Sequence, residues 1–424
     1  MSTSTPEAAV RPVFRERRFL WLWGGQTISQ FGEQFSGLAI PVLAVVLLHA
    51  EAWQLGVLNA ASTAAFLIVG LPAGAWIDRM LKRKVMIASD LLRAVALAAI
   101  PVLWWLGVLQ VWHLVIVAVL VGVGSVFFDV SYQSYIPFIV EPRQVGDANA
   151  KLEASFQVAR IGGPAIAGAL LTVMAAPLLL LADAISYLVS ALAVSRVRDR
   201  EVRADPTERL GLGREIAEGI RFVARQPLIR RIVGTTAFSN FFGTMVTLLL
   251  PLLLLRTLQL GPEGLGLVLA VGSVGGLLGA MATPHLARWL GEGTVIPLSA
   301  IASAIFYAVI PLAVLLPHLS LPILIVALFW QSFMVLVYNI SQVSLRQRLC
   351  PPRLLGRMNA SIRFVVWGVI PIASLIAGFL GTQLGVVPTM WIGVVGASVG
   401  CVFVVFSPLF GMRTLPTEAD QRVT

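Results

Sequence analysis

Long apolar stretches separated by short polar connections follow one another along the whole chain. A helix needs about 20 mostly apolar residues to cross the hydrocarbon of a bilayer. With this length as the measure, the pattern predicts twelve membrane-spanning helices. The predicted spans are residues 19–48, 54–76, 85–107, 112–138, 150–175, 178–195, 232–255, 265–287, 294–316, 321–345, 360–384 and 389–411.

The composition supports an all-α membrane protein. Apolar residues make up 58% of the chain and charged residues 12%, whereas soluble domains have about 45–50% and about 25%. So few polar residues cannot cover a water-soluble globule. Cys350 lies in a predicted loop and Cys401 in the last span, so they do not indicate a disulfide, and no metal-ligand spacing occurs. We expect no cofactor, and no signal peptide is recognised at the N-terminus.

The basic residues predict the orientation of the chain. Of 31 Lys and Arg residues only Arg256 falls at a predicted outer end. Loops that stay in the cytoplasm carry an excess of Lys and Arg, so both termini are predicted to be cytoplasmic. The net charge of +10 therefore reflects membrane topology, and no nucleic-acid partner is expected.

The chain is internally duplicated at a constant offset of 210 residues. This offset is near half the length, so it predicts two parallel repeats of six helices each. The matched pairs are Leu55-Gly56 with Leu265-Gly266, Pro142-Arg143 with Pro352-Arg353, Gly146 with Gly356, Asn149-Ala150 with Asn359-Ala360, and Ile166-Ala167-Gly168 with Ile376-Ala377-Gly378. The expected parts are a cytoplasmic segment 1–18, a bundle 19–195, a cytoplasmic linker 196–231 with an amphipathic helix, a bundle 232–411 and a cytoplasmic tail 412–424.

Polar side chains form stripes on several predicted spans. Ionisable groups inside a membrane are costly and by default face a cavity or one another, so we predict a water-accessible cavity between the halves. Its candidate lining residues are Gln26, Gln30, Glu33, Asp129, Tyr132, Gln133, Gln157, Asn240, Phe241, Thr244, Gln331, Met334 and Tyr338. The alternative is that these groups only bind neighbouring helices by hydrogen bonds. Asp183 lies near the outer end of its span and could simply reach the membrane interface.

Two motifs carry a family resemblance. Gly74-Ala75-Trp76-Ile77-Asp78-Arg79 followed by Lys82-Arg83-Lys84 resembles the signature between spans two and three of the major facilitator superfamily, although Leu81 stands where that motif usually has glycine. Arg160-Ile161-Gly162-Gly163-Pro164-Ala165-Ile166-Ala167-Gly168 looks like the glycine-proline motif of that superfamily's exporters. Gly162, Gly163 and Gly168 would let helices pack closely, and Pro164 would let its helix bend. Asp90 with Arg93, Asp147-Ala148-Asn149-Ala150 and Glu218-Gly219-Ile220-Arg221-Phe222 resemble the siderophore and macrolide exporter branch.

The resemblance implies a carrier whose halves alternate between two open states. The basic residue that many drug exporters carry in span four is absent, since residues 112–138 contain no Lys or Arg. Arg160 could supply this cation near Asp129. Glu33, Asp129 and Arg160 are therefore the candidates for proton coupling. No GxxxxGK[ST] motif occurs, so the proton gradient is the expected energy source.

A charge reversal between the repeats suggests a conformational switch. At the constant offset between the repeats, Asp78 corresponds to Arg288 and Glu153 to Arg363. In the family, spans two and eleven adjoin, as do spans five and eight. Asp78 would then face Arg363, and Arg288 would face Glu153, as two ion pairs that close the inner side in the outward-open state. The candidate switch residues are Gly74, Asp78, Arg79, Lys82, Arg83, Asp90, Arg93, Glu153, Arg288 and Arg363.

We therefore predict a secondary active transporter that exports a bulky amphipathic molecule of the drug, macrolide or siderophore class by alternating access and proton antiport. It would be a monomer in the bacterial plasma membrane, with the lipid bilayer, the small-molecule substrate and protons as its partners. The alternative within transport is a lipid or lysophospholipid flippase of the same fold. No HExxH or GxSxG motif occurs that would support a membrane-embedded enzyme. A non-transporting receptor is equally unsupported.

Overall fold

The computed structural model describes residues 13–77, 80–197, 220–351 and 354–413, which form helices and no strand. The first half contains α1 (Arg17–Val42), α2 (Ala52–Ile77), α3 (Lys82–Trp105), α4 (Val111–Tyr135), α5 (Val145–Leu170) and α6 (Ala176–Arg196). The second contains α8 (Pro227–Leu252), α9 (Gly261–Leu290), α10 (Val295–Leu312), α11 (Ser320–Leu349), α12 (Leu355–Gln383) and α13 (Val386–Val405). Short 3₁₀ helices cover Val13–Arg15, Ile136–Phe138, Pro142–Gln144, Ala313–Leu315 and Pro317–Leu319. Each predicted span coincides with one of these long helices, so the all-helical prediction is confirmed.

Eleven helices within the described residues are long and apolar enough to cross a membrane. Helix α5 is more polar because it carries Glu153, Gln157 and Arg160. Twelve crossings and cytoplasmic termini therefore stay predictions. The amphipathic helix expected in the linker falls mostly within residues 198–219, outside the described residues.

The duplication extends to unusual backbone geometry. A π-helical turn at Leu43–Leu47 ends the first long helix, and another at Leu253–Thr257, the equivalent segment of the second repeat, ends α8. His49 has φ 49°, and Gln259, its counterpart in the second repeat, has φ 53°. Positive φ is uncommon for residues other than glycine. The two halves therefore repeat even the local conformation at the end of their first helix.

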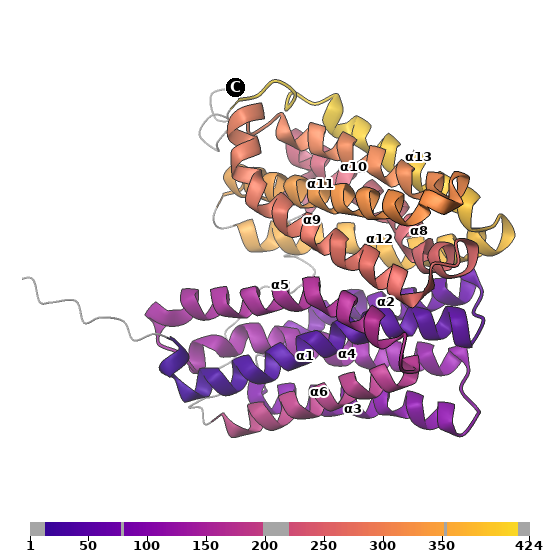
Figure 1. Ribbon diagram of the computed structural model, residues 1–424. Helices are drawn as coiled ribbons and strands as arrows, with labels where there is room; N and C mark the ends of the chain where they lie inside the picture. The colour runs from indigo at the N-terminus through magenta and orange to yellow at the C-terminus, as the bar shows by residue number, and fades with distance from the viewer. Residues whose placement is uncertain (1–12, 78–79, 198–219, 352–353, 414–424) are drawn as a thin grey trace, which may run out of the picture.

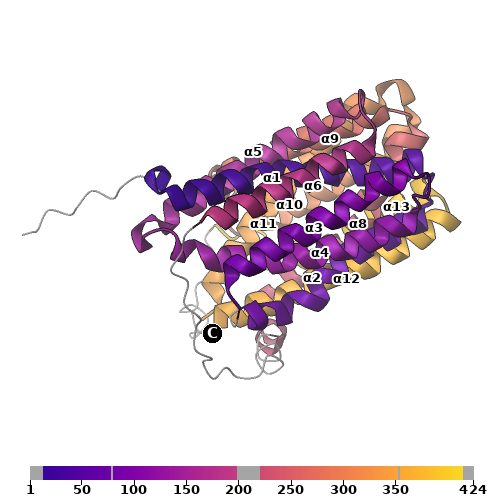
Figure 2. The ribbon, with the colours of Figure 1, turned by 90° about the horizontal axis from the view of Figure 1, so that it is seen from below.

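The halves meet through two equivalent pairs of helices, α2 with α12 and α5 with α9, which run side by side in Figures 1 and 2. This confirms the adjacency that the resemblance implied. A Cβ atom on Gly56 would lie 2.9 Å from Cα of Gly378, and one on Gly266 would lie 2.8 Å from Cα of Gly168. The residues that match between the repeats thus include the glycines that let the backbones cross closely.

Among the described residues, the contacts between the halves are concentrated at one end of the bundle. Nη2 of Arg256 donates to the carbonyl oxygen of Val45 at 3.0 Å, across the two π-helical turns. Nearer the middle, Nδ2 of Asn59 on α2 donates to Oγ of Ser374 on α12 at 2.7 Å. These hydrogen bonds, together with the glycine crossings, close that end.

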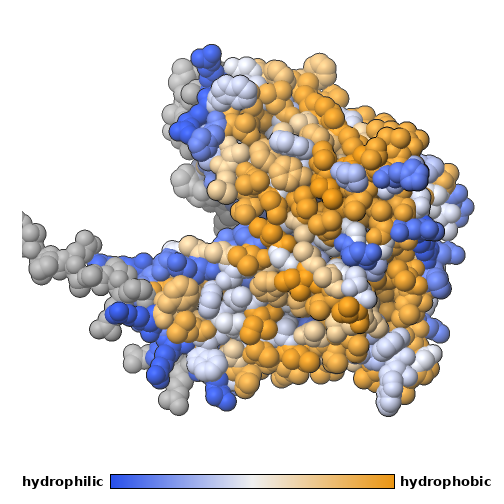
Figure 3. Space-filling view, viewed as in Figure 1, coloured by the Kyte–Doolittle hydropathy of each residue, from blue (hydrophilic) through white to orange (hydrophobic). Residues whose placement is uncertain are grey.

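The opposite end, here called the basic end, carries Arg83, Arg288 and Arg348. There Arg83 donates to the carbonyl oxygens of Val194 and Ser195 at the end of α6, where cations offset the helix dipole. The halves diverge towards this end (Figure 1), and the surface is hollowed between them (Figure 3). The bundle is therefore closed at one end and open at the basic end.

Candidate functional site

A cavity of about 280 Å³ lies where the two halves meet. It mixes apolar walls with a few hydroxyl and amide groups, as small-molecule sites commonly do. Its lining residues come from α1, α2, α4 and α8: Ser36, Gly37, Ile40, Pro41, Leu55, Leu58, Asn59, Ser62, Ala118, Thr247, Leu248 and Pro251. A larger pocket of about 510 Å³, between Met80 and Phe127, is lined only by the first half. The smaller cavity is therefore the better candidate for a site between the halves.

Glu33 lies on a face of α1 that neither α5 nor α6 covers. Its neighbour Gly32 lies directly against Ser186 of α6, and Gln34 packs against Gly163 of α5. These contacts turn the intervening side chain of Glu33 away from both neighbouring helices. The side chain is exposed although it lies in the middle of α1.

Asp129 on α4 is half-buried and lies close enough to Glu33 and Arg93 to interact electrostatically with both. Arg93, on α3, thus supplies the cation that we had expected from Arg160. The expectation for Arg160 was wrong because α3 packs against α4, whereas α5 packs against α1 and α9. Arg160 is exposed on α5.

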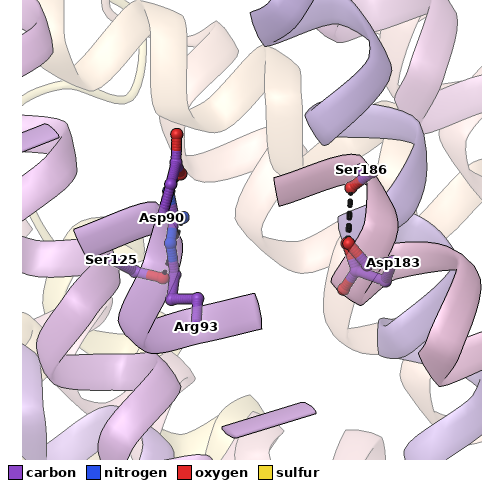
Figure 4. Close-up of polar contacts among 5 residues, drawn as sticks. All are labelled: Asp90, Arg93, Ser125, Asp183 and Ser186. Atoms are coloured by element: carbon purple, nitrogen blue, oxygen red, sulfur yellow. Dashed lines mark hydrogen bonds and ion pairs between the residues drawn. The ribbon is translucent and has the colours of Figure 1, made fainter. Parts of the chain in front are cut away.

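Arg93 is held tightly inside the first half (Figure 4). Its guanidinium carbon lies 4.5 Å from the ring centre of Phe128 and 4.1 Å from that of Tyr187, and it forms an ion pair with Asp90. Asp90 is fully buried and Arg93 is 4% exposed. This candidate switch pair therefore lies well inside α3, packed against α4 and α6, and its part in a switch stays a prediction.

Asp183 does not reach the membrane interface. It is completely buried, and its carboxylate accepts hydrogen bonds from Ser36 on α1 and from Ser186 at 3.0 Å. Figure 4 shows Asp183 and Ser186 together on α6. The missed signal is the small-residue stripe on α1, where Gly25 and Gly32 both lie directly against α6.

Other predicted residues of the first half surround this region. Gln26 and Gln30 each bury an Oε1 atom that has no hydrogen-bond partner within the described residues. Tyr132 stacks on Phe128 with ring centres 6.0 Å apart, and Gln133 is exposed. The Oε1 atoms of Gln26 and Gln30 can therefore accept hydrogen bonds from water or a ligand.

On α5, Nε2 of Gln157 donates to Oε1 of Glu153 at 2.7 Å. Gly163 packs directly against Gln34 of α1, and a Cβ on Gly162 would lie 3.8 Å from the Phe31 ring. The carbonyl oxygen of Pro164 faces Gly266 of α9. The glycine-proline segment is thus where α5 packs on α1 and α9.

The predicted residues of the second half mostly join helices to one another. Nδ2 of Asn240 donates to the carbonyl oxygen of Val366 at 2.9 Å. The hydroxyl of Tyr338 lies 2.8 Å from that of Thr236, and its ring is buried. Nδ2 of Asn240 and the hydroxyl of Tyr338 are therefore engaged in helix packing, which favours the alternative that such groups bind neighbouring helices by hydrogen bonds.

The remaining members of that set are similarly enclosed. The hydroxyl of Thr244 donates to the carbonyl oxygen of Asn240 at 2.6 Å, and Gln331 is 8% exposed. Phe241 packs edge-on against Phe242, with ring centres 5.0 Å apart. Met334 is half-buried.

The switch residues of the basic end are only partly described. Asp78, Arg79 and the surroundings of Gly74 lie outside the described residues. Lys82 lies over the ring of Phe138, 5.2 Å from its centre. Arg363 similarly lies 5.8 Å from the ring centre of Trp367.

The partners proposed for closure at this end are apart. Glu153 and Arg288 are both exposed, and no ion pair between these two described residues is formed. No group of three or more potential metal ligands occurs within the described residues either.

Two six-helix halves that meet at one end and open at the other, around an internal cavity, are the architecture expected of a membrane transporter of the major facilitator superfamily. The chain belongs to the transmembrane secretion effector family, whose model matches residues 8–423.

Known proteins of similar sequence include efflux pumps. The chain is 28% identical to the multidrug efflux pump Tap of Mycolicibacterium fortuitum, over 84% of this chain and 87% of that protein. It is 22% identical to the macrolide efflux protein A of Streptococcus pyogenes, over 94% and 97%. A bacterial homologue of the iron transporter ferroportin, solved in the inward-facing state, has the same fold with a TM-score of 0.72 at 17% identity, over 93% of this chain and 99% of that one.

Proposed function

We propose that this protein exports bulky amphipathic molecules from the cell in exchange for protons. The observation that carries the proposal is an exposed carboxylate, Glu33, in the middle of α1. It lies close enough to Asp129 and to Arg93 to interact electrostatically with both. The efflux pumps among the similar proteins support the direction of transport.

The proposed cycle alternates access to one site. In the open form described here, substrate would enter from the basic end, which the excess of Lys and Arg assigns to the cytoplasm. In the opposite form Glu33 and Asp129 would take up protons from outside, which would favour release of a cationic substrate. Return to the present form would release those protons to the cytoplasm.

Proton-driven efflux from proteoliposomes tests the two carboxylates. We expect Glu33→Gln and Asp129→Asn to lose the dependence of ethidium efflux on an imposed pH gradient. Glu51→Gln is the control, since Glu51 is an exposed carboxylate outside the cavity. Unchanged coupling in both Glu33→Gln and Asp129→Asn would reject the assignment of these two carboxylates.

Because the basic end is open, the two ion pairs proposed to close it can be tested by exchanging their charges. Glu153 and Arg288 lie at the inner parts of adjacent helices, α5 and α9, and both are free to approach when the halves close. We expect Glu153→Arg and Arg288→Glu each to slow efflux, and the double exchange to restore part of it. The same design applies to Asp78 and Arg363. No recovery in either double exchange would remove the closure pairs from the mechanism.

A susceptibility panel identifies the substrate class. Expression in a host without its own pumps should raise resistance to macrolides and cationic dyes, and Glu33→Gln should abolish that resistance. A siderophore panel in the same host tests the other predicted class. Translocation of labelled lysophospholipid without any drug resistance would instead indicate a flippase.

A further inference from the structure

Asp183 is an acid that the proposed mechanism does not use. It is completely buried between α6 and α1. Oδ1 accepts a hydrogen bond from Ser186 Oγ at 3.0 Å, and Oδ2 accepts a hydrogen bond from Ser36 Oγ. Neither a Lys nor an Arg of the described residues is paired with it. In an apolar interior an unpaired carboxylate is stable chiefly as the neutral acid.

Ser36 connects this acid to the cavity between the halves. It is one of the residues that line the cavity of about 280 Å³, and it is 7% exposed. Asp183 itself has no exposed surface. The Ser36 hydroxyl is therefore the group through which Asp183 can exchange a proton with water in the cavity.

The charged and titratable groups that face Asp183 come from three helices. Glu33 approaches from α1, Arg93 from α3, and Tyr187 lies on α6 itself. The positive charge of Arg93 is already engaged by the ion pair with Asp90. No uncompensated cation among the described residues is thus left to hold Asp183 in its ionised form.

We infer that Asp183 is a second proton-binding site, distinct from Glu33 and Asp129, and that Ser36 transmits its protonation state to the cavity. The inference rests on the proposed proton coupling. A hydronium ion in the cavity gives a proton to Ser36 Oγ and becomes water, while the hydroxyl proton of Ser36 moves to the ionised Asp183 Oδ2. The serine ends the step as it began, and Asp183 becomes neutral.

This exchange reverses the hydrogen-bonding character of the cavity wall. When Asp183 is ionised, Ser36 donates to it and presents only lone pairs to the cavity. When Asp183 is protonated, it donates to Ser36, whose own hydroxyl can then donate into the cavity. A substrate with an N–H donor, such as a protonated amine, therefore binds the ionised form and is released by proton uptake, which is the order of events in an antiporter.

Infrared titration of the purified protein in lipid tests the proton site without any substrate. The measurement uses the Glu33→Gln/Asp129→Asn background, so that those two acids contribute nothing. We expect a carboxylic-acid carbonyl band that titrates with pH, disappears in Asp183→Asn, shifts in Ser36→Ala and stays in place in Ser36→Thr, which keeps the hydroxyl. Ser36→Ala removes only one hydroxyl, so it gives a result even if Asp183→Asn does not fold.

The outcomes separate this inference from the proposed function. The inference that Asp183 binds a proton is overturned by either of two results. One is a titrating band that neither Asp183→Asn nor Ser36→Ala changes, and the other is the absence of any such band. If the band behaves as expected while Glu33→Gln and Asp129→Asn keep normal coupling, the assignment of those two carboxylates fails and the Asp183 site stands.

Ligand binding tests the expected substrate chemistry. Ethidium carries N–H donors, whereas tetraphenylphosphonium is a cation without any. Ser36→Ala should weaken ethidium binding by about tenfold or more at alkaline pH and leave tetraphenylphosphonium binding unchanged. Equal weakening of both probes, or no saturable binding of ethidium to the wild type, overturns the donor-bearing substrate class.

Discussion

Adding one methyl group where the halves cross should shift the balance between the two open states. A Cβ on Gly266 of α9 would lie 2.6 Å from the carbonyl oxygen of Pro164 and 2.8 Å from Cα of Gly168. Both neighbours are backbone atoms of α5, so no side chain can rotate out of the way. To reach an ordinary contact of about 3.5 Å, the two helices must separate by about 0.7–0.9 Å.

The energetic consequence follows from the place of this contact. Overpacking of a tight site costs about 1–3 kcal/mol, and here that cost falls on the state in which this end is closed. If the crossing loosens when this end opens, Gly266→Ala should move the population towards the opposite state by about 5–150-fold. Gly56→Ala, at the symmetric crossing with α12, should act in the same direction.

Distances between spin labels on the two halves measure this shift. Cysteines at Val108 and Leu315 would carry the labels, because both residues are exposed near the closed end, in a background where Cys350 and Cys401 are serine. We expect a longer distance component to grow in Gly266→Ala and more so in the double variant with Gly56→Ala.

A matched control separates crowding from a general effect of alanine. A Cβ on Gly146, near the start of α5, would meet nothing within 4 Å, so Gly146→Ala should keep the wild-type distances. If Gly266→Ala gave the wild-type distance distribution and the wild-type efflux rate, the glycine crossing would not control the closed end.

Three further perturbations test the charged and packed sites. Arg93→Ala should lower stability by about 3–5 kcal/mol, because it leaves Asp90 buried and unpaired; thermal unfolding measures this, and Asp90→Ala in the same chain should recover part of it. Arg348→Ala should change stability by less than about 1 kcal/mol, since its pair with Glu292 (2.7 and 3.0 Å) is exposed, and a larger loss would contradict this. Gly32→Ala should push the carboxylate of Asp183 away from Ser36, whereas Gly24→Ala, with open space around its Cβ, should leave the infrared band unchanged.

The helices could be predicted from the sequence because the membrane imposes one length and one backbone structure on every apolar segment. The constant offset between matching motifs identified the halves, and the glycines among those motifs are the ones at the helix crossings. The boundaries differ where helices continue into the water. Helix α5 begins at Val145 rather than near 150, and α11 extends to Leu349 rather than 345.

The charged site was only partly predictable, because it depends on which helices adjoin. The stripe on α1 placed Glu33 on a face that neighbouring helices leave uncovered, but the partner of Asp129 could not be chosen between α3 and α5 without their packing. Asn240 and Tyr338 form stripes just as regular, yet their polar atoms bind neighbouring helices. Periodicity gives the face of a helix, and it does not say whether water or another helix covers that face.

The duplication also bears on why the first half holds a buried acid. Gly32 of α1 lies against Asp183 of α6, and at the equivalent positions of the second repeat Phe242 of α8 lies against Gly393 of α13. Gly393 faces the backbone oxygen of Phe242, and the Phe242 ring lies over Gly396, the counterpart of Ser186, so this crossing is formed without any charge. Replacing buried charges by apolar groups is often neutral or stabilising, so packing alone does not explain an acid at Asp183. That supports the proposed role of Asp183 as a proton-binding site, which the second half does not repeat.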